Sequence, residues 1–135
     1  MFKKTTFVTL AILSGFSNAH DIDVFYKGIA PGHEYVPGST IKYIDVAGVE
    51  NLESIISQGL SPDPSEAIKQ VNSYMSSSQG QEWIANMKDA ARGVAKAYKL
   101  NLKGVPAIVI NDAAVVYGTF DVKQALEVYE EALKE

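Results

Sequence analysis

One segment near the end of the chain restricts the possible folds more than any other, namely residues 101–118 with the sequence NLKGVPAIVINDAAVVYG. Pro106 precedes a run of four apolar residues, a short turn follows, and a second apolar run is closed by Gly118. Because proline has no N–H group to give to a ladder, it is typical of the first residue of a strand or of an edge strand. The pattern predicts a β-hairpin over residues 105–117, with Pro106 at the start of its first strand.

This hairpin resembles the one that follows the cis-proline in proteins of the thioredoxin fold, where a Gly-Val-Pro segment opens the third strand of the core. In that fold the proline loop faces a Cys-x-x-Cys pair, whereas this chain contains no cysteine. Thiol–disulfide exchange is therefore excluded, because its nucleophile is a cysteine thiolate. The resemblance implies the scaffold and a cis peptide bond before Pro106, without the redox chemistry.

The segment before the helices indicates two strands joined by a loop. Alternating polar and apolar residues predict a strand over 21–26, and β-branched and aromatic residues predict another over 40–46. Residues 27–39 between them contain two Pro and three Gly, which is typical of a loop. A parallel connection needs about a dozen residues, so this loop is just long enough to join two parallel strands.

Two short helices are expected after the second strand. Asn51 is a candidate cap for the first helix, and Gly59 is placed to end it in the left-handed conformation. Asp63 as the N-cap and Pro64 as the first helical residue give a good start to the second helix. The serines and the glycine within residues 76–80 predict a break or kink where this helix would otherwise continue.

A long helix over residues 81–99 and a final helix capped by Asp121 complete the predicted order. The expected apolar face of the long helix consists of Trp83, Met87, Ala90, Ala91, Val94, Ala95 and Tyr98. The expected stripe of the final helix consists of Val122, Ala125, Leu126, Tyr129, Ala132 and Leu133. The predicted fold is α/β and thioredoxin-like: a mixed four-stranded sheet with helices on its faces, in which a loop replaces the first crossover helix.

The first 19 residues follow the three-part pattern of a secretory signal peptide. Lys3 and Lys4 form a basic start, residues 7–16 are mostly apolar, and residues 17–19 are small or polar before a cut. The apolar stretch is shorter than the ~20 residues that a membrane-spanning helix needs. We therefore expect a periplasmic protein with one domain over residues 20–135 and no membrane span after signal cleavage. A buried amino-terminal helix is the alternative.

Charge and composition disfavour several classes of partner. Removal of Lys3 and Lys4 from the 12 Lys and Arg residues leaves 10 against 16 Asp and Glu, a net charge of −6. Phosphate contact depends on clustered cations, so this balance argues against nucleic acid and against an anionic membrane surface. An exported protein without cysteine has no disulfides, and its fold must therefore depend on its core alone.

The loop over residues 27–39 is the first candidate binding site, because it takes the position of the redox pair in the thioredoxin-like scaffold. Its polar and aromatic residues are His33, Glu34 and Tyr35. Loops above a strand end are common recognition sites. A solvated turn is the alternative for this segment.

The proline segment is the second candidate. A cis-proline loop can expose backbone N–H and C=O groups that pair with an extended peptide. Val105 and Ala107 would flank Pro106 in such a groove, and Tyr117 ends the hairpin where it can be partly exposed. The alternative is that Pro106 only sets the direction in which the strand begins.

The two histidines suggest a copper site as a further alternative. After cleavage His20 would offer both an α-amine and an imidazole, and His33 would add a third nitrogen, a ligand type that suits copper. The first strand separates them, however, and its five or six residues span roughly 15–20 Å. We therefore predict no metal and no cofactor. The familiar sequence motifs of hydrolases, zinc proteases and nucleotide-binding enzymes are also absent, so we predict no enzymatic activity.

An ordered set of segments resembles a family of small exported proteins encoded in bacterial integrating conjugative elements. The segments are Gly59-Leu60, Asp63-Pro64, Ala97-Tyr98, Val105–Val109, Val115–Gly118, Asp121 and Ala125-Leu126. The resemblance implies a periplasmic, thioredoxin-like component of a conjugative type IV secretion system, whose partners are other proteins of the conjugation apparatus. We therefore expect a non-enzymatic protein that acts by protein–protein contact. A periplasmic chaperone-like binding protein and the copper-binding protein based on His20 are the alternatives.

Overall fold

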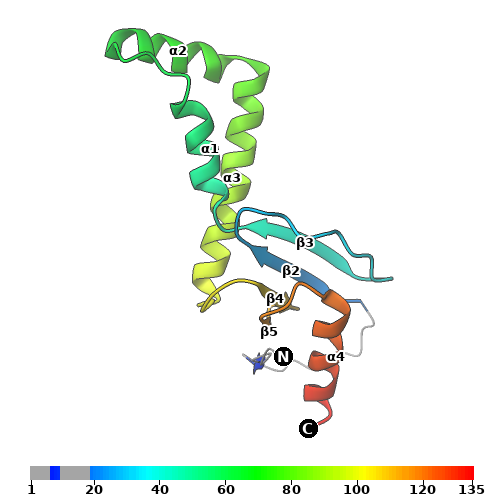
Figure 1. Ribbon diagram of the computed structural model, residues 1–135. Helices are drawn as coiled ribbons and strands as arrows, with labels where there is room; N and C mark the ends of the chain where they lie inside the picture. Colours follow the sequence, from blue (N-terminus) through cyan, green and yellow to red (C-terminus); the bar gives the residue numbers. More distant parts are fainter. Residues whose placement is uncertain (1–6, 10–18) are drawn as a thin grey trace.

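The computed structural model describes residues 7–9 and 19–135 of the chain (Figure 1). The predicted signal peptide therefore lies outside the described residues, except for residues 7–9 and 19. The elements are β1 (Phe7–Thr9), β2 (Asp21–Tyr26), β3 (Thr40–Asp45), α1 (Gly48–Ser57), α2 (Pro64–Ser76), α3 (Ser78–Lys99), β4 (Ala107–Ile110), β5 (Ala114–Tyr117) and α4 (Val122–Leu133). Within the described ranges, no helix combines the length and the apolar character that crossing a membrane requires.

The predicted mixed α/β architecture is confirmed. The sheet has the order β1-β5-β4-β2-β3, in which β2 and β3 are parallel and the other neighbours are antiparallel. The four predicted strands are contiguous in it, and β1 adds a fifth strand outside β5. As expected, the segment over residues 27–39 contains no helix. The strand that follows Pro106 is an inner strand, and the peptide bond between Val105 and Pro106 is cis. This arrangement is compatible with a thioredoxin-like core.

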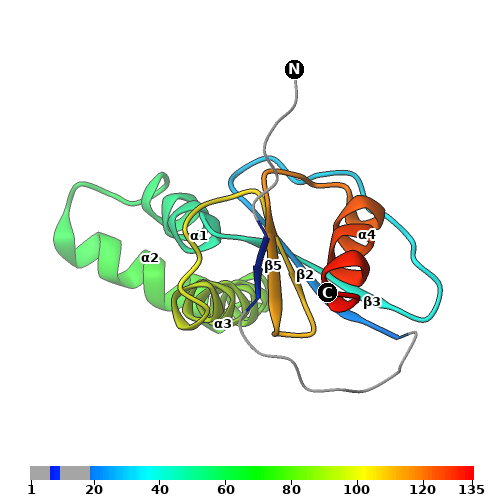
Figure 2. The same cartoon turned by 90° about the horizontal axis from the view of Figure 1, so that it is seen from below.

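Alternation along the strands divides the core between the two faces of the sheet. Figure 2 shows α4 on one face and α3 on the other. The cluster under α4 consists of Ile22, Val24, Ile108, Ile110, Val116, Val122, Ala125 and Leu126. The cluster on the α3 face consists of Phe25, Ile44, Ala107, Val109 and Val115, with Ala97, Leu100 and Leu102 packed against it. Both halves of the core use β2, β4 and β5, so these strands hold the domain together.

A helical arm formed by residues 48–87 projects from the sheet (Figure 1). Neither α1 nor α2 contains a buried residue. The arm is held by contacts among its helices, one of which is a hydrogen bond of 2.9 Å from the indole Nε1 of Trp83 to the carbonyl oxygen of Leu52. This bond ties α1 to α3 without any contribution from the sheet.

The corner between α2 and α3 is sharp, as the serine-rich segment predicts. The Ser77 side chain accepts a hydrogen bond of 3.1 Å from the backbone N–H of Gly80, so Ser77 caps the start of α3. A Cβ atom at Gly80 would lie only 1.8 Å from the carbonyl oxygen of Tyr74. The last turn of α2 therefore approaches α3 so closely that only glycine fits at residue 80.

The predicted start of α1 is wrong, and its end lies directly before Gly59 as expected but has a different conformation. The helix begins three residues before Asn51, and its N-cap Ala47 makes no side-chain capping bond. Asp45 at the end of β3 instead accepts a hydrogen bond of 2.8 Å from the Ala47 N–H, so the chain passes from strand to helix without a polar cap. Gly59 does not end the helix in the left-handed conformation, because Gln58 is a right-handed C-cap and Gly59 has no positive φ.

The expected face of α3 is also partly wrong. Tyr98 is 85% exposed, and Ala91 and Ala95 are exposed as well. The side that meets the sheet instead runs through Gly93, where a Cβ atom would lie 2.5 Å from Cγ2 of Ile44. A glycine carries no apolar signal, so a search for apolar spacing cannot find the position at which the helix lies closest to the sheet.

Candidate functional site

The register of the sheet brings together the strand ends on which the predicted site depends. Ala107 lies opposite Phe25 of β2 on one side and opposite Tyr117 of β5 on the other. Pro106 therefore directly precedes β4, at the end of the sheet where β2 and β5 finish. We call this end of the sheet the proline end, and the loop over residues 27–39 begins there.

The predicted binding residues lie on opposite faces of this end. Val105 and Tyr117 pack against the cluster on the α3 face, to which buried Ala107 belongs. The Tyr117 hydroxyl accepts a hydrogen bond of 3.1 Å from the backbone N–H of Lys103, which anchors the segment before Pro106. His33 stacks instead on Tyr43, a residue that packs against the cluster under α4. The two candidate sites of the sequence therefore form two neighbouring surfaces, one on each face of the sheet.

Glu34 and His33 hold the loop in place. Oε1 of Glu34 accepts a hydrogen bond of 3.0 Å from the N–H of Val122, the first residue of α4, and the Glu34 N–H donates to the Tyr43 hydroxyl at 2.8 Å. A carboxylate at a helix N-terminus satisfies a free donor and is favoured by the helix dipole. The ring of His33 lies parallel to that of Tyr43, with 4.4 Å between the centroids. Both predicted polar residues are thus bound within the protein.

Apolar side chains at this end are exposed. Tyr35 is 78% exposed, as the sequence led us to expect of a loop residue. Ile29 is 87% exposed and Phe120 is 40% exposed, and neither was predicted as a site residue. An isoleucine in a loop rich in Gly and Pro, and a phenylalanine next to the helix cap Asp121, were the sequence signals that could have identified them.

An open hollow of about 520 Å³ separates the loop from the start of α4. Its lining residues are Pro31, Gly32, His33, Glu34, Phe120, Asp121 and Lys123. Asp121 accepts a hydrogen bond of 3.0 Å from the N–H of Gln124 and caps α4, so this acidic group also has a structural partner. The hollow is broad and open to solvent, which suits the side chains of a partner protein better than an enclosed small molecule.

The backbone at the proline has unused hydrogen-bonding groups. The carbonyl oxygen of Pro106 accepts a hydrogen bond of 3.1 Å from the N–H of Gly118. The N–H and C=O groups of Val105 have no hydrogen-bond partner within the described part of the chain. Backbone groups of this kind can pair with an extended segment of another protein.

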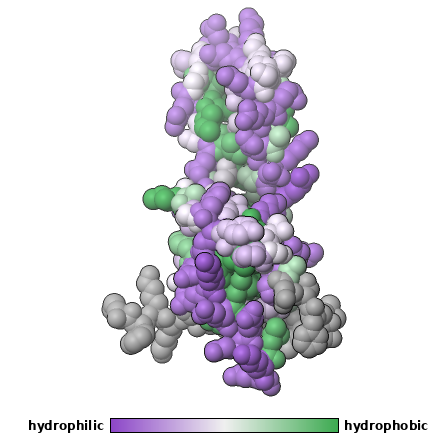
Figure 3. Space-filling view, turned by 90° about the vertical axis from the view of Figure 1, so that its right-hand side faces the viewer, coloured by the Kyte–Doolittle hydropathy of each residue, from purple (hydrophilic) through white to green (hydrophobic). Residues whose placement is uncertain are grey.

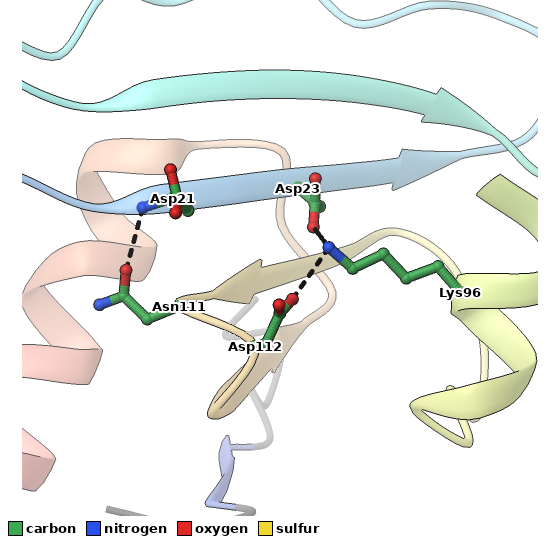
Figure 4. Close-up of polar contacts among 5 residues, drawn as sticks. All are labelled: Asp21, Asp23, Lys96, Asn111 and Asp112. Atoms are coloured by element: carbon green, nitrogen blue, oxygen red, sulfur yellow. Dashed lines mark hydrogen bonds and ion pairs between the residues drawn. The ribbon is translucent and has the colours of Figure 1, made fainter. Parts of the chain in front are cut away.

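A second polar cluster lies away from the proline end, between α3 and the sheet (Figure 4). The Nζ atom of Lys96 forms ion pairs with Asp23 of β2 and, at 2.9 Å, with Asp112 of the β4–β5 turn. Burial alone would lower the pKa of Lys96, but hydrogen bonds and charge from the two aspartates outweigh it and raise the pKa above its ordinary value. Strand alternation places Asp23 on the α3 face, where it is 9% exposed, and the half-buried Lys96 covers it.

The histidines of the copper alternative lie in different surroundings. His20 lies at the start of β2, where its Nδ1 is 3.0 Å from Nδ2 of Asn111 and its ring meets Tyr129 edge-on. His33 is stacked on Tyr43 near the start of α4. Across residues 7–9 and 19–135 no group of three or more His, Cys, Asp or Glu side chains is arranged to hold a metal ion.

The fold and this site together define a cysteine-free α/β protein with a mixed sheet, whose candidate site presents apolar side chains and free backbone groups. The family model described as "Protein of unknown function (DUF1525)" matches residues 19–134, so the chain belongs to that family. Comparison with curated proteins and with solved structures finds no match.

Proposed function

We propose that this protein is a non-enzymatic periplasmic component of a conjugative type IV secretion apparatus and that it acts by contact with another protein through the proline end. The observation that carries the proposal is that polar and apolar side chains at this end have different roles. The polar side chains are engaged within the protein, whereas Ile29, Tyr35 and Phe120 are exposed. Exposed apolar groups held on a fixed framework favour a binding surface.

The chemistry of this end supports contact rather than catalysis. The carboxylates of Glu34 and Asp121 accept backbone N–H groups of α4, and the chain offers no thiol. A nucleophile needs a base within hydrogen-bond reach, and the two carboxylates here are bonded to backbone N–H groups instead. What remains available is apolar surface and the backbone of Val105, both of which suit a polypeptide partner.

The cellular context of the proposal rests on the resemblance to proteins of integrating conjugative elements and on the signal-peptide pattern of residues 1–19. The compatible sheet order supports the thioredoxin-like part of that resemblance. The net charge of −6 expected after cleavage favours a protein partner over nucleic acid.

Affinity capture from the periplasm of donor cells tests this proposal. The protein should recover a component of the secretion apparatus, and a triple variant with Ile29→Ser, Tyr35→Ser and Phe120→Ser should lose it and reduce conjugative transfer. Tyr98→Ser is the matched control, because Tyr98 is equally exposed but lies on α3 away from the proline end. Recovery of no apparatus component, or equal transfer by the triple variant and the control, would contradict the proposal.

A periplasmic chaperone-like protein remains the second candidate because the arm also exposes apolar surface. Figure 3 shows hydrophobic side chains on the arm as well as near the sheet. An apolar hollow of about 240 Å³ lies between the end of α1 and α2, and Ile55 and Ile68 are 61% and 62% exposed. A chaperone should suppress the aggregation of an unrelated, thermally unfolded protein at stoichiometric concentration. Unchanged aggregation would remove this candidate.

A further inference from the structure

Without β1, the sheet would end at β3 and β5, and these two strands differ in how they are protected. β3, with the sequence TIKYID, carries exposed Lys42 and ends at Asp45. β5, with the sequence AVVY, carries no charge and no proline. Natural sheets protect an open edge with charged residues or proline because an apolar edge pairs with other chains. β3 has such protection, whereas the composition of β5 is that of a strand with a neighbour on both sides.

One hydrogen bond shows which backbone groups of β5 point outward. The N–H of Gly118 donates to the carbonyl oxygen of Pro106, so even-numbered residues of β5 are directed toward β4. Successive residues of an antiparallel strand direct their backbone groups to opposite sides. The N–H and C=O groups of Val115 and Tyr117 therefore point away from β4, toward the outer edge.

This edge is occupied by a segment from the beginning of the chain. β1 pairs antiparallel with β5, and Phe7, Val8 and Thr9 lie opposite Val116, Val115 and Ala114 respectively. Figure 2 shows the short strand alongside β5. Val8 therefore lies opposite Val115, whose backbone groups point outward. The edge accepts an uncharged strand of aromatic and β-branched residues.

The occupying strand belongs to the segment that the sequence predicts to be removed. The family match begins at residue 19, after the predicted cleavage point. Loss of residues 1–19 would uncover the outward groups of β5.

We propose that the outer edge of β5 is a strand-acceptor site, which residues 7–9 cover before processing and an extended apolar segment of another protein covers afterwards, added antiparallel. This inference rests on the proposed function, because it requires the amino-terminal segment to be removed and the partner to be a protein. Residues 7–9, which pair with this edge, indicate the chemistry of the later occupant, namely an uncharged strand of aromatic and β-branched residues. A second copy is disfavoured because each processed domain would carry a net charge of −6.

The first experiment uses the full chain and measures amide hydrogen exchange at Val115, the residue opposite Val8. Val8→Pro removes the N–H that faces Val115 and weakens the pairing of the two strands, so the Val115 amide should exchange at least about tenfold faster in this variant, the ratio that 1.4 kcal/mol produces. Exchange at Ile108 in the inner strand β4 is the internal control and should not change. Equal exchange at Val115 in the two full-length proteins would overturn the proposal.

The second experiment uses the domain over residues 20–135 and a synthetic peptide with the sequence of residues 4–11. The peptide should bind and slow exchange at Val115 and Tyr117, whereas the same peptide with Val8→Pro should bind at least about tenfold more weakly. Absence of binding, or equal binding of the two peptides, would overturn the proposal. A domain that is already dimeric with a protected Val115 amide would overturn the choice of occupant, because a second copy would then fill the edge.

Failure of this inference can be told apart from failure of the proposed function. The triple variant at Ile29, Tyr35 and Phe120 leaves β5 unchanged, so it should bind the peptide like the unmodified domain. Loss of conjugative transfer in the triple variant together with absence of peptide binding to the unmodified domain would support the proline end and reject the edge. Unchanged transfer in the triple variant together with peptide binding to the unmodified domain would reject the proline end as the binding surface and support the edge of β5 as a strand-acceptor site.

Discussion

The sheet and the helical arm are stabilised by different interactions. Every residue of β4 is buried, whereas no residue of α1 or α2 is buried. Burial of apolar surface contributes roughly 25 cal/mol per Å², so the free energy of folding is concentrated in the sheet and its two covering helices. The arm depends on local contacts such as the caps at Asp63 and Ser77 and the bond from Trp83 to Leu52.

This difference indicates two levels of stability within one chain. A region with few buried contacts opens at lower free energy than the core to which it is attached. The arm should therefore open locally while the sheet remains folded, and changes in the arm should leave the sheet unaffected. The proline end and the edge of β5 belong to the stable region, which suits surfaces that must keep a fixed shape.

The largest expected effect comes from making the same substitution in both regions. Ile108 is completely buried in β4, and Ile55 in α1 is 61% exposed. Ile108→Ala should lower the free energy of unfolding by about 2–5 kcal/mol, because it removes buried methyl groups and leaves a cavity. Ile55→Ala should change it by less than about 0.5 kcal/mol. Urea unfolding followed by circular dichroism measures both free energies. Equal losses of stability in the two variants would contradict the distinction between the sheet and the arm.

The ion pair between α3 and the sheet gives the next effect. Lys96→Met leaves Asp23 buried without its cation and should cost about 1–3 kcal/mol, a range reduced because the Lys96 side chain is 35% exposed. The folded-state pKa of Lys96 is raised, so its contribution is fully present below the ordinary value of 10.5 and is lost as pH rises through the higher folded value.

Unfolding at pH 7 and above pH 10.5 checks both parts of this expectation. The difference between the unmodified protein and Lys96→Met should be constant near neutral pH and should shrink in alkali. Lys88→Met on the same helix is the control, because Lys88 is exposed and belongs to none of the described ion pairs. A difference that grows with pH would rule out this account of the pair.

The corner of the arm should give an effect of similar size that stays local. Gly80→Ala places a methyl group where the Tyr74 carbonyl oxygen lies, which should destabilise the α2–α3 corner by about 1–3 kcal/mol. Gly59→Ala is the matched control, because its Cβ would meet nothing within 4 Å and its φ is not positive. Amide exchange should rise in α2 and stay unchanged in β4. Faster exchange in β4 as well would show that arm and sheet unfold together.

The sequence predicts those features that depend on neighbouring residues. Asp63 followed by Pro64 predicts the start of α2, and Asp121 predicts the cap of α4, because each side chain bonds to N–H groups two or three residues further on. Pro106 before four apolar residues likewise predicts an inner strand once the thioredoxin-like resemblance supplies the neighbours. Local chemistry determines the two helix caps, the resemblance adds the place of the strand after Pro106, and the structure confirms all three.

The features that escape prediction depend on distant partners. The burial of Asp23 requires Lys96, which is 73 residues away, and the anchoring of Glu34 requires Val122, which is 88 residues away. The sequence offers the loop and the proline segment as two candidates, but it does not reveal that His33 and Val105 belong to opposite faces of the sheet. The exposed Ile29 and Phe120 were missed because apolar residues are expected in the core.

The smallest expected effect is the loss of helical structure at the start of α2 in acid. The backbone N–H of Glu66, together with the Ser65 side chain and N–H, lowers the pKa of Asp63 below its ordinary value of 3.8. The contribution of the charged cap is therefore present above that value and is lost as pH falls through the lower folded one. Helical chemical shifts over residues 64–67 should decline in acid in the unmodified protein and should not depend on pH in Asp63→Asn, since asparagine caps equally well without titrating. Asp63→Ala should lose the shifts at every pH, while β4 keeps its shifts in all three proteins. An acid transition of the same midpoint in Asp63→Asn would show that another group controls the arm.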